Sequence, residues 1–167
     1  MFVQFISIPI MLLLSVLQMT AISRVTLING SADIILIAIA AWGIREKSSG
    51  AYLWALIGGL LVSFASAVPF PAPLLPYLVT ALLARSIQSR LWQSPILSMI
   101  GVVTVSTIFQ HLFSILVLQF GGLEIGFIES LSSVTMPSLL LNFLFLFPVF
   151  FLINDLARWV LREEVYD

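Results

Sequence analysis

The order of apolar and polar positions divides this chain into six apolar segments, separated by short joins that hold nearly all of the charged residues. About 20 consecutive apolar residues form a helix that crosses the roughly 30 Å hydrocarbon core of a bilayer. Joins are marked by charged clusters such as Arg45-Glu46-Lys47 and by the proline-rich run from Pro69 to Pro73, which cannot continue a helix. The pattern predicts helices over about 2–22, 32–44, 51–68, 74–87, 95–120 and 136–160, of which the second and fourth are short for a span.

Composition supports a membrane protein. Charged residues make up 9% of the 167 residues, hydrophobic residues make up 60%, and the mean hydropathy is +1.15. A soluble domain could not bury this much apolar surface. We therefore expect an all-α polytopic membrane protein with about six transmembrane helices, forming a single integral membrane domain over residues 1–167. The first segment has no basic region before it and is longer than the apolar part of a signal peptide, so we expect a retained helix.

Charge and cysteine content narrow the possible functions. The net charge is -1 and the basic residues are scattered, which argues against nucleic-acid binding. Because the chain has no cysteine, disulfides and thiolate metal sites are excluded.

The distribution of Lys and Arg predicts the orientation in the membrane. Arg24 falls on one side, and the other basic residues all fall on the opposite side, namely Arg45, Lys47, Arg85, Arg90, Arg158 and Arg162. Basic residues are enriched in cytoplasmic joins, so both termini are expected to be cytoplasmic, which requires an even number of spans. The longest join, Gly121 to Thr135, carries Glu124 and Glu129 and is expected on the outer face.

Small residues recur every four positions in the third segment, at Ala51, Ala55, Gly59, Ser63 and Ala67. Such residues lie on one helical face, where they let two backbones approach closely. The pattern favours packing within this chain, and docking of a partner's helix is the alternative.

Asp33 stands at the start of the second segment, after Ser31. A carboxylate in the first helical turn is stabilised by the helix dipole, and this interpretation is favoured. The alternative is an anchor that pairs across helices or with a partner chain, and Arg24 on the same side is a candidate counter-charge.

Further polar residues lie in the fifth and sixth segments. Gln110 and His111 occur near Thr104, Ser106 and Thr107, forming the most polar patch within the apolar segments. A hydrogen-bonded interhelical role is favoured over a proton relay, because no second titratable group can be placed near the histidine.

In the sixth segment, Asn142 is expected to form hydrogen bonds between helices. Pro148 is expected to kink this helix. Asp155 and Arg158 are spaced to pair near its end.

Motifs for catalysis are missing from the sequence. No Gly-x-Ser triplet offers a serine nucleophile in a recognisable context, and no glycine-rich phosphate loop with a following Lys occurs. A single histidine cannot build a histidine-rich metal site. We therefore expect no catalytic residues, no metal, no cofactor and no enzymatic activity.

Several short motifs cover most of the chain. They comprise Asp33-Ile34-Ile35-Leu36, Trp42-Gly43-Ile44-Arg45, Gly50-Ala51, Gly58-Gly59-Leu60-Leu61, Ser66-Ala67-Val68-Pro69-Phe70, Ala84-Arg85 and Pro137-Ser138-Leu139-Leu140-Leu141-Asn142, with Pro148 following. Together these motifs resemble the family of the rod shape-determining membrane protein MreD, which is similar in length and topology. Ser63 departs from the pattern, because the family commonly carries Asp at that position.

The resemblance implies a non-catalytic scaffold of the cell-wall elongation machinery in the bacterial inner membrane. It implies direct binding of MreC and, through it, association with the actin-like MreB and the peptidoglycan synthases. The implied fold resembles the S component of an energy-coupling-factor transporter. For contact with a partner or between helices, the candidates are the small-residue positions of the third segment together with Asp33 and Asn142.

The alternative function is that of such an S component, which binds a vitamin. S components typically carry an Ala-x-x-x-Ala motif on the first helix, whereas the first segment here has only Ala21. A vitamin pocket would favour polar and aromatic groups near the outer face, but Trp42, Trp54 and Trp92 are expected nearer the cytoplasmic end. The scaffold is therefore preferred.

Overall fold

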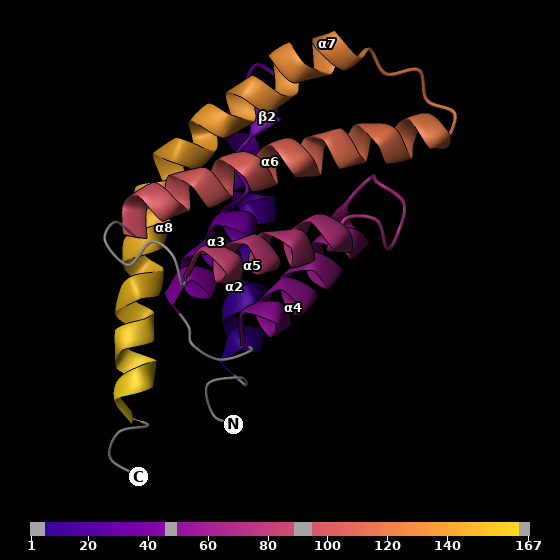
Figure 1. Ribbon diagram of the computed structural model, residues 1–167. Helices are drawn as coiled ribbons and strands as arrows, with labels where there is room; N and C mark the ends of the chain where they lie inside the picture. Colours follow the sequence, from indigo (N-terminus) through magenta and orange to yellow (C-terminus); the bar gives the residue numbers. More distant parts are fainter. Residues whose placement is uncertain (1–5, 46–49, 89–94, 164–167) are drawn as a thin grey trace.

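The computed structural model describes residues 6–45, 50–88 and 95–163. Lys47, Arg90 and Trp92, on which parts of the predicted topology rest, lie outside these residues, as does the start of the first predicted helix. The described chain is a bundle of helices (Figure 1), comprising α2 (Ser7–Thr20), α3 (Ile34–Arg45), α4 (Gly50–Ala65), α5 (Leu74–Gln88), α6 (Pro95–Phe120), α7 (Phe127–Ser130) and α8 (Met136–Glu163).

Three helical stretches among the described residues are long and apolar enough to cross a membrane. These stretches are Ser7–Arg24, Pro95–Phe120 and Phe127–Val160. The helices α3, α4 and α5 are apolar but shorter. The described chain is therefore mostly helical and has three helical stretches that could cross a membrane, in agreement with the coarse apolar pattern.

The helix α3 forms the centre of the bundle. All eleven residues from Ile34 to Ile44 are buried, whereas α2 buries only Ser7, Met11 and Ser15. Small residues in α3 allow its neighbours to approach, because a Cβ atom added at Gly43 would lie 2.8 Å from the Cβ of Ala84 in α5. The helices α2, α4, α5, α6 and α8 therefore enclose α3.

The structure differs from the prediction at the end of one helix and in the form of one join. The helix α4 ends at Ala65, three residues before the predicted end, because the chain turns ahead of the prolines that follow. The join from Gly121 to Thr135 is not a loop throughout, since α7 and a π-helical segment, η2 (Leu131–Thr135), lead directly into α8.

A short hairpin connects α2 to α3 and was not predicted. After a 3₁₀ turn, η1 (Ile22–Arg24), the strands β1 (Thr26–Leu27) and β2 (Gly30–Ser31) pair antiparallel. The hairpin lies against the start of α8: a Cβ atom at Gly30 would be 2.5 Å from the backbone nitrogen of Ser138 and 2.7 Å from the carbonyl oxygen of Val134. Only glycine fits this approach without a shift of the backbone.

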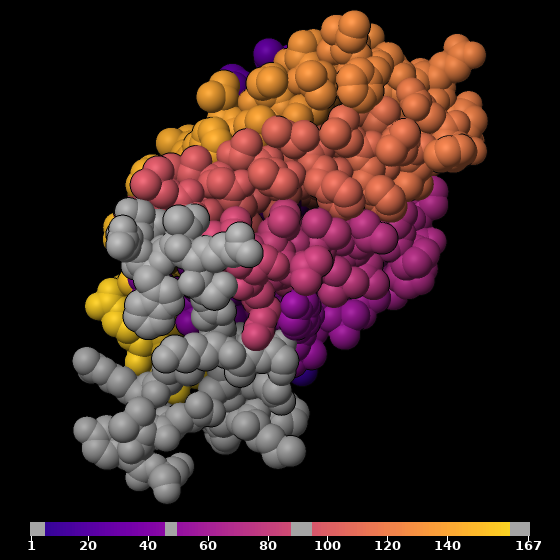
Figure 2. All heavy atoms as spheres, viewed as in Figure 1, coloured from indigo at the N-terminus to yellow at the C-terminus, as the bar shows by residue number. Residues whose placement is uncertain are grey.

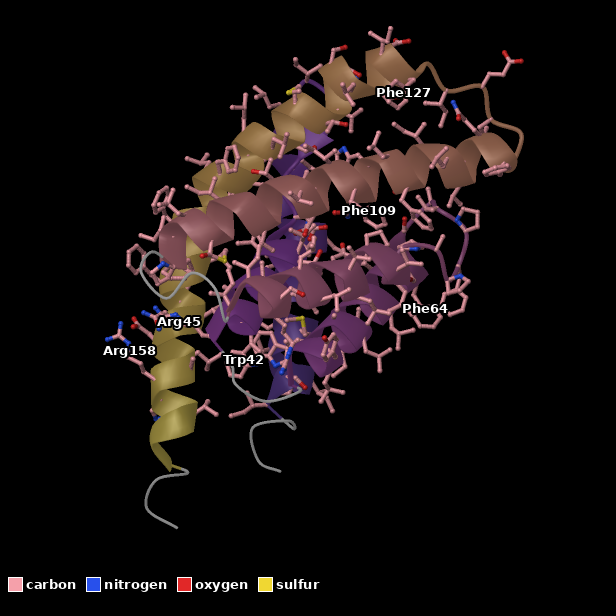
Figure 3. All side chains as sticks on the ribbon, viewed as in Figure 1. Trp42, Arg45, Phe64, Phe109, Phe127 and Arg158 are labelled. Atoms are coloured by element: carbon pink, nitrogen blue, oxygen red, sulfur yellow. The ribbon has the colours of Figure 1, made fainter. Side chains whose placement is uncertain are left out.

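Basic and aromatic residues gather at the far end of α3. Trp42 stacks on Trp54 of α4 with ring centroids 4.4 Å apart, and the guanidinium of Arg45 lies 5.2 Å from the ring centroid of Phe150. Arg158 forms an ion pair with Asp155 at 3.2 Å, as the spacing predicts. Figure 3 shows Arg45 and Arg158 close together and Phe127 at the opposite end of the molecule. We call this region the basic end.

The long helices cover one side of the bundle. Figure 2 shows α6 crossing this face, with the α7–α8 segment along one edge and α5 along the other.

In Figure 1, α8 changes direction along its length, and Pro148 lies within it. A proline inside a helix removes a backbone hydrogen bond and bends the axis, which accounts for this change.

Candidate functional site

Asp33 caps the N-terminus of α3. Its Oδ1 accepts a hydrogen bond from the backbone N–H of Leu36 at 2.9 Å, and its carbonyl oxygen accepts one from Ile37 at 3.1 Å. A side-chain oxygen at this position satisfies a backbone donor that has no partner within the helix. The negative charge also lies at the positive end of the helix dipole. The favoured interpretation of Asp33 as a first-turn carboxylate therefore agrees with its geometry.

The second carboxylate oxygen of Asp33 connects three helices. Oδ2 accepts a hydrogen bond from the Tyr77 hydroxyl of α5 at 2.6 Å and another from Nε2 of Gln110 in α6 at 2.9 Å. Tyr77 is only 1% exposed. Asp33 is therefore both a helix cap and an interhelical anchor, because its two oxygens serve the two roles separately.

Asn142 brings the last helix to the same point. Its Oδ1 accepts a hydrogen bond from the backbone N–H of Asp33 at 2.7 Å, and its Nδ2 donates to the Thr107 hydroxyl at 2.8 Å. Asn142 and Thr107 are each 1% exposed. One side chain of α8 therefore joins α3 and α6, which is the interhelical role expected of Asn142.

Gln18 adds α2 to the network. Its Nε2 donates to the carbonyl oxygen of Ala32 at 2.7 Å, and its Oε1 accepts from the backbone N–H of Ile34 at 3.0 Å. Together these side chains form a connected group, which we call the Asp33 node, consisting of Gln18, Asp33, Tyr77, Thr107, Gln110 and Asn142. The node fixes the start of α3 relative to α2, α5, α6 and α8.

Two members of the node, Gln18 and Tyr77, were not identified from the sequence. A signal for them was present. Gln18 is near the end of the first predicted span and Tyr77 is near the start of the fourth. If successive spans cross the membrane in alternating directions, both residues lie on the same side as Asp33. Each also places a polar group in an apolar segment. Such groups need partners at membrane depth, and Asp33 was the nearest strong acceptor.

Arg24, the candidate counter-charge under the alternative interpretation of Asp33, does not pair with the carboxylate. Arg24 is exposed in η1, and the partners of the carboxylate are the neutral groups of Tyr77, Gln110 and the Leu36 backbone. Within the described ranges, the ion pair that forms joins Asp155 and Arg158 instead.

The small-residue positions of α4 face the interior of the chain. Ala51, Ala55, Gly59 and Ser63 are buried. A Cβ atom at Gly59 would lie 3.2 Å from the Cα of Leu74 in α5, so the close approach that these residues permit is used within the bundle. Ala67 does not belong to this face, because the helix ends before it and the residue is exposed.

Gln110 and His111 diverge from one another. Gln110 belongs to the node, whereas Nδ1 of His111 lies 3.1 Å from the hydroxyl of Thr135 at the end of η2. Both side chains therefore connect α6 to other elements by hydrogen bonds, as favoured from the sequence.

The node can hold helices together but offers little to a substrate. Each oxygen of the Asp33 carboxylate already accepts hydrogen bonds, and Thr107 and Asn142 are enclosed. No group of three or more His, Cys, Asp or Glu residues is placed to hold a metal ion in the described part of the chain.

Comparisons of the sequence with protein-family models and with curated proteins, and of the fold with solved structures, found no match.

Proposed function

We propose that this chain is a non-catalytic scaffold of the MreD type in a bacterial cytoplasmic membrane. In this proposal it binds MreC directly and thereby associates with MreB and the peptidoglycan synthases of cell-wall elongation, helping to maintain a rod shape. Its contribution is assembly and positioning, which requires a rigid membrane body and no reaction.

The observation that carries the proposal is the contact between Asp33 and Asn142. These residues belong to two motifs, 109 positions apart, that resemble the MreD family, and they meet directly through a hydrogen bond of 2.7 Å. A polar residue inside a membrane protein commonly marks a transport path or a reaction. Here the two polar residues hold helices together, and this use suits a scaffold.

The distribution of charge supports a multi-pass arrangement with both termini in the cytoplasm. Arg45 and Arg158 gather at the basic end, and Glu124 and Glu129 lie in the segment between α6 and α8. Basic residues favour the cytoplasmic side. The helix α3 is only about 18 Å long, given a rise of about 1.5 Å per residue, whereas the hydrocarbon core is roughly 30 Å thick. In a six-span arrangement, the surrounding helices would therefore have to shield the ends of α3 from lipid.

The partner is proposed to bind on the outside of the bundle. The small residues of α4 and the Asp33 carboxylate, which were the sequence-based candidates, are occupied within the chain. Large apolar side chains are exposed on α2 and α8, including Leu13 at 60% and Leu152 at 71%. A transmembrane helix of MreC would pack against such an outward face, which also contacts membrane lipid.

One observation favours the alternative, an S component of a vitamin transporter. Polar residues of α6, including His111 and Ser114, line a cavity near the Asp33 end of the bundle. Convergent polar groups in that region are expected of a vitamin-binding site. The two proposals therefore differ in a consequence that can be measured in cells.

Depletion of the protein in its native bacterium tests the proposal. Rod-shaped cells should become round as the protein is lost, and expression of the wild-type chain or of the exposed-site variant Arg24→Ala should restore rods. An Asp33→Ala variant should restore shape poorly, because the node would be disrupted. Cells that stay rod-shaped but require an external vitamin would contradict the scaffold and support the transporter component.

A further inference from the structure

A cavity of about 350 Å³ lies between α6 and the segment formed by α7 and η2. Gln110, His111 and Ser114 line one wall, and Ser130 and Thr135 line the other. Ligand sites in proteins commonly have volumes of about 300–1,000 Å³ and combine apolar walls with a few polar groups. The cavity is large enough for part of a small molecule, and it borders the node, because Gln110 belongs to both.

The wall opposite α6 has an uncommon backbone. In the π-helical segment η2 the Thr135 hydroxyl approaches the carbonyl oxygen of Ser130 at 3.5 Å, and the same hydroxyl meets His111. The loop before α7 is also held, because Nε2 of Gln119 donates to the carbonyl oxygen of Ile125 at 3.0 Å. Single π-helical turns occur frequently at functional sites. Both features keep the wall in place beside α6.

Polar groups in the cavity retain hydrogen-bonding capacity. The Ser114 and Ser130 hydroxyls form no side-chain hydrogen bond with the described residues. Gln110 donates through Nε2 to the node, which leaves Oε1, and His111 uses Nδ1, which leaves Nε2. The Ser114 and Ser130 hydroxyls can each donate and accept a hydrogen bond, and Oε1 of Gln110 can accept one. Hydroxyl groups on a ligand match this set because they also donate and accept.

The charge around the cavity selects against an anion. Its lining includes His111 but no Asp, Glu, Lys or Arg, and the carboxylates nearest in sequence are those of the exposed Glu124 and Glu129. Like charges repel, and an unpaired charge in a largely apolar cavity is costly. An uncharged ligand is therefore favoured over a fatty acid or an anionic phospholipid.

Apolar residues surround this region of the molecule. Phe120 is 91% exposed, Phe127 is 52% exposed and Ile128 is 82% exposed, and all three flank the loop that borders the cavity. Figure 3 shows Phe127 at the end of the molecule away from the basic end. Exposed side chains of this kind are stable in contact with lipid. A ligand that approaches past them would come from the membrane.

From these features we propose that the cavity binds the hydroxyl-bearing head of an uncharged membrane amphiphile. The hydroxyls would bond to Ser114, Ser130 and the free acceptor of Gln110. The hydrocarbon chain would pass over the apolar lining residues Leu118 and Ile125 towards the surrounding lipid. This site goes beyond the proposed scaffold role and does not depend on it.

Photolabelling with a monoacylglycerol that carries a diazirine on its chain tests the site in the purified protein. Because the diazirine is on the hydrocarbon chain, peptide mapping should place the label at and around Leu118 and Ile125. Ser114→Leu, which fills the cavity, should reduce labelling there about tenfold, equivalent to about 1.4 kcal/mol of binding free energy. Ser86→Leu is the matched control, because Ser86 is exposed on α5 outside the cavity, and it should label like the wild type.

Competition identifies the ligand class. Unlabelled monoolein should displace the probe, whereas oleate and water-soluble vitamins such as biotin or riboflavin should not. Equal labelling of the Ser114→Leu and Ser86→Leu variants would show contact with surrounding lipid only and would overturn the proposal. Displacement by a vitamin at lower concentration than monoolein would overturn it as well. If Ser114→Leu fails to fold, Ser130→Leu on the opposite wall provides the same test.

Discussion

The Asp33 node and the neighbouring cavity use the same helix in opposite ways. Thr107 and Gln110 of α6 join the node, while His111 and Ser114, less than two turns further on, line the cavity. Polar groups of the node bond to one another, whereas the cavity has hydroxyls that lack side-chain partners in the described structure. Polar residues of similar type on one helix therefore differ in whether the chain itself satisfies their hydrogen bonds, and the proposed ligand site rests on this difference.

Removal of the Asp33 carboxylate should have the largest effect on stability. In Asp33→Ala, Tyr77, Gln110 and the backbone N–H of Leu36 each lose an acceptor. We expect the free energy of unfolding to fall by about 2–4 kcal/mol, since each lost bond costs about 0.5–1.5 kcal/mol and two of the donors, on Tyr77 and Leu36, stay buried. Titration of the purified protein from mild detergent into sodium dodecyl sulfate measures this change.

The matched control is Arg24→Ala. Arg24 is exposed and does not contact the carboxylate, so its removal should alter the free energy of unfolding by no more than about 0.5 kcal/mol. Equal effects of the two substitutions would mean that the node does not stabilise the bundle.

Substitution of Gly30 should have the next largest effect. This glycine seats the hairpin beside the node, and a Cβ atom would meet the backbone of Ser138 and Val134 at 2.5 and 2.7 Å. Gly30→Ala should therefore destabilise the protein by about 1–3 kcal/mol, the usual cost of overpacking.

Gly101→Ala provides the comparison for Gly30. A Cβ atom at Gly101 in α6 would meet nothing within 4 Å, and alanine in a helix interior is favoured by about 0.5–1 kcal/mol over glycine. We expect a higher melting temperature in detergent for Gly101→Ala and a lower one for Gly30→Ala. The same shift for both would refute the close contact at Gly30.

A single bond of the node should contribute less. Tyr77→Phe removes the hydroxyl that donates to Asp33 at 2.6 Å, and we expect a loss of about 1 kcal/mol. In the Asp33→Ala background the same change should cost almost nothing, because its acceptor is already absent. Additive losses in this double-mutant cycle would show that the bond contributes no coupling energy.

Hydroxyls of the cavity should contribute least to stability. Ser114→Ala and Ser130→Ala should each change the free energy of unfolding by less than about 0.5 kcal/mol, since neither removes a side-chain hydrogen bond within the described structure. A loss as large as that of Tyr77→Phe would place these serines in the structural network. The serine hydroxyls of the cavity would then stabilise the fold as the side chains of the node do, and the comparison between the two regions would fail.

The apolar pattern predicted the helices well where proline or charge marks their ends. The segments 95–120 and 74–87 agree closely with α6 and α5, because Pro95 and the prolines before Leu74 delimit them. The residues from Gly121 to Thr135 were interpreted only as a join between two helices, and the helical turns within it were not predicted. The helical turns at the end of this segment lie in close contact with Gly30, which is over 100 positions earlier in the chain. The periodicity of apolar residues does not reveal a contact between such distant positions.

The candidate site was predicted in parts. The importance of Asp33 and Asn142 was visible because polar side chains are costly within apolar segments. Their direct contact was not, since the spacing of residues along one helix does not determine which helices are neighbours. The two interpretations of Asp33 were treated as alternatives, although a carboxylate has two oxygens and satisfies both.

The scaffold is tested most directly by extraction of the tagged protein from its native membrane in a gentle detergent, followed by mass spectrometry of the proteins that co-purify. An unrelated tagged protein from the same membrane serves as the control. The proposal predicts enrichment of MreC, together with components of the wall-synthesis machinery. Recovery of a pair of ATPases with a membrane coupling subunit, in the absence of MreC, would contradict it and identify the chain as part of a transporter.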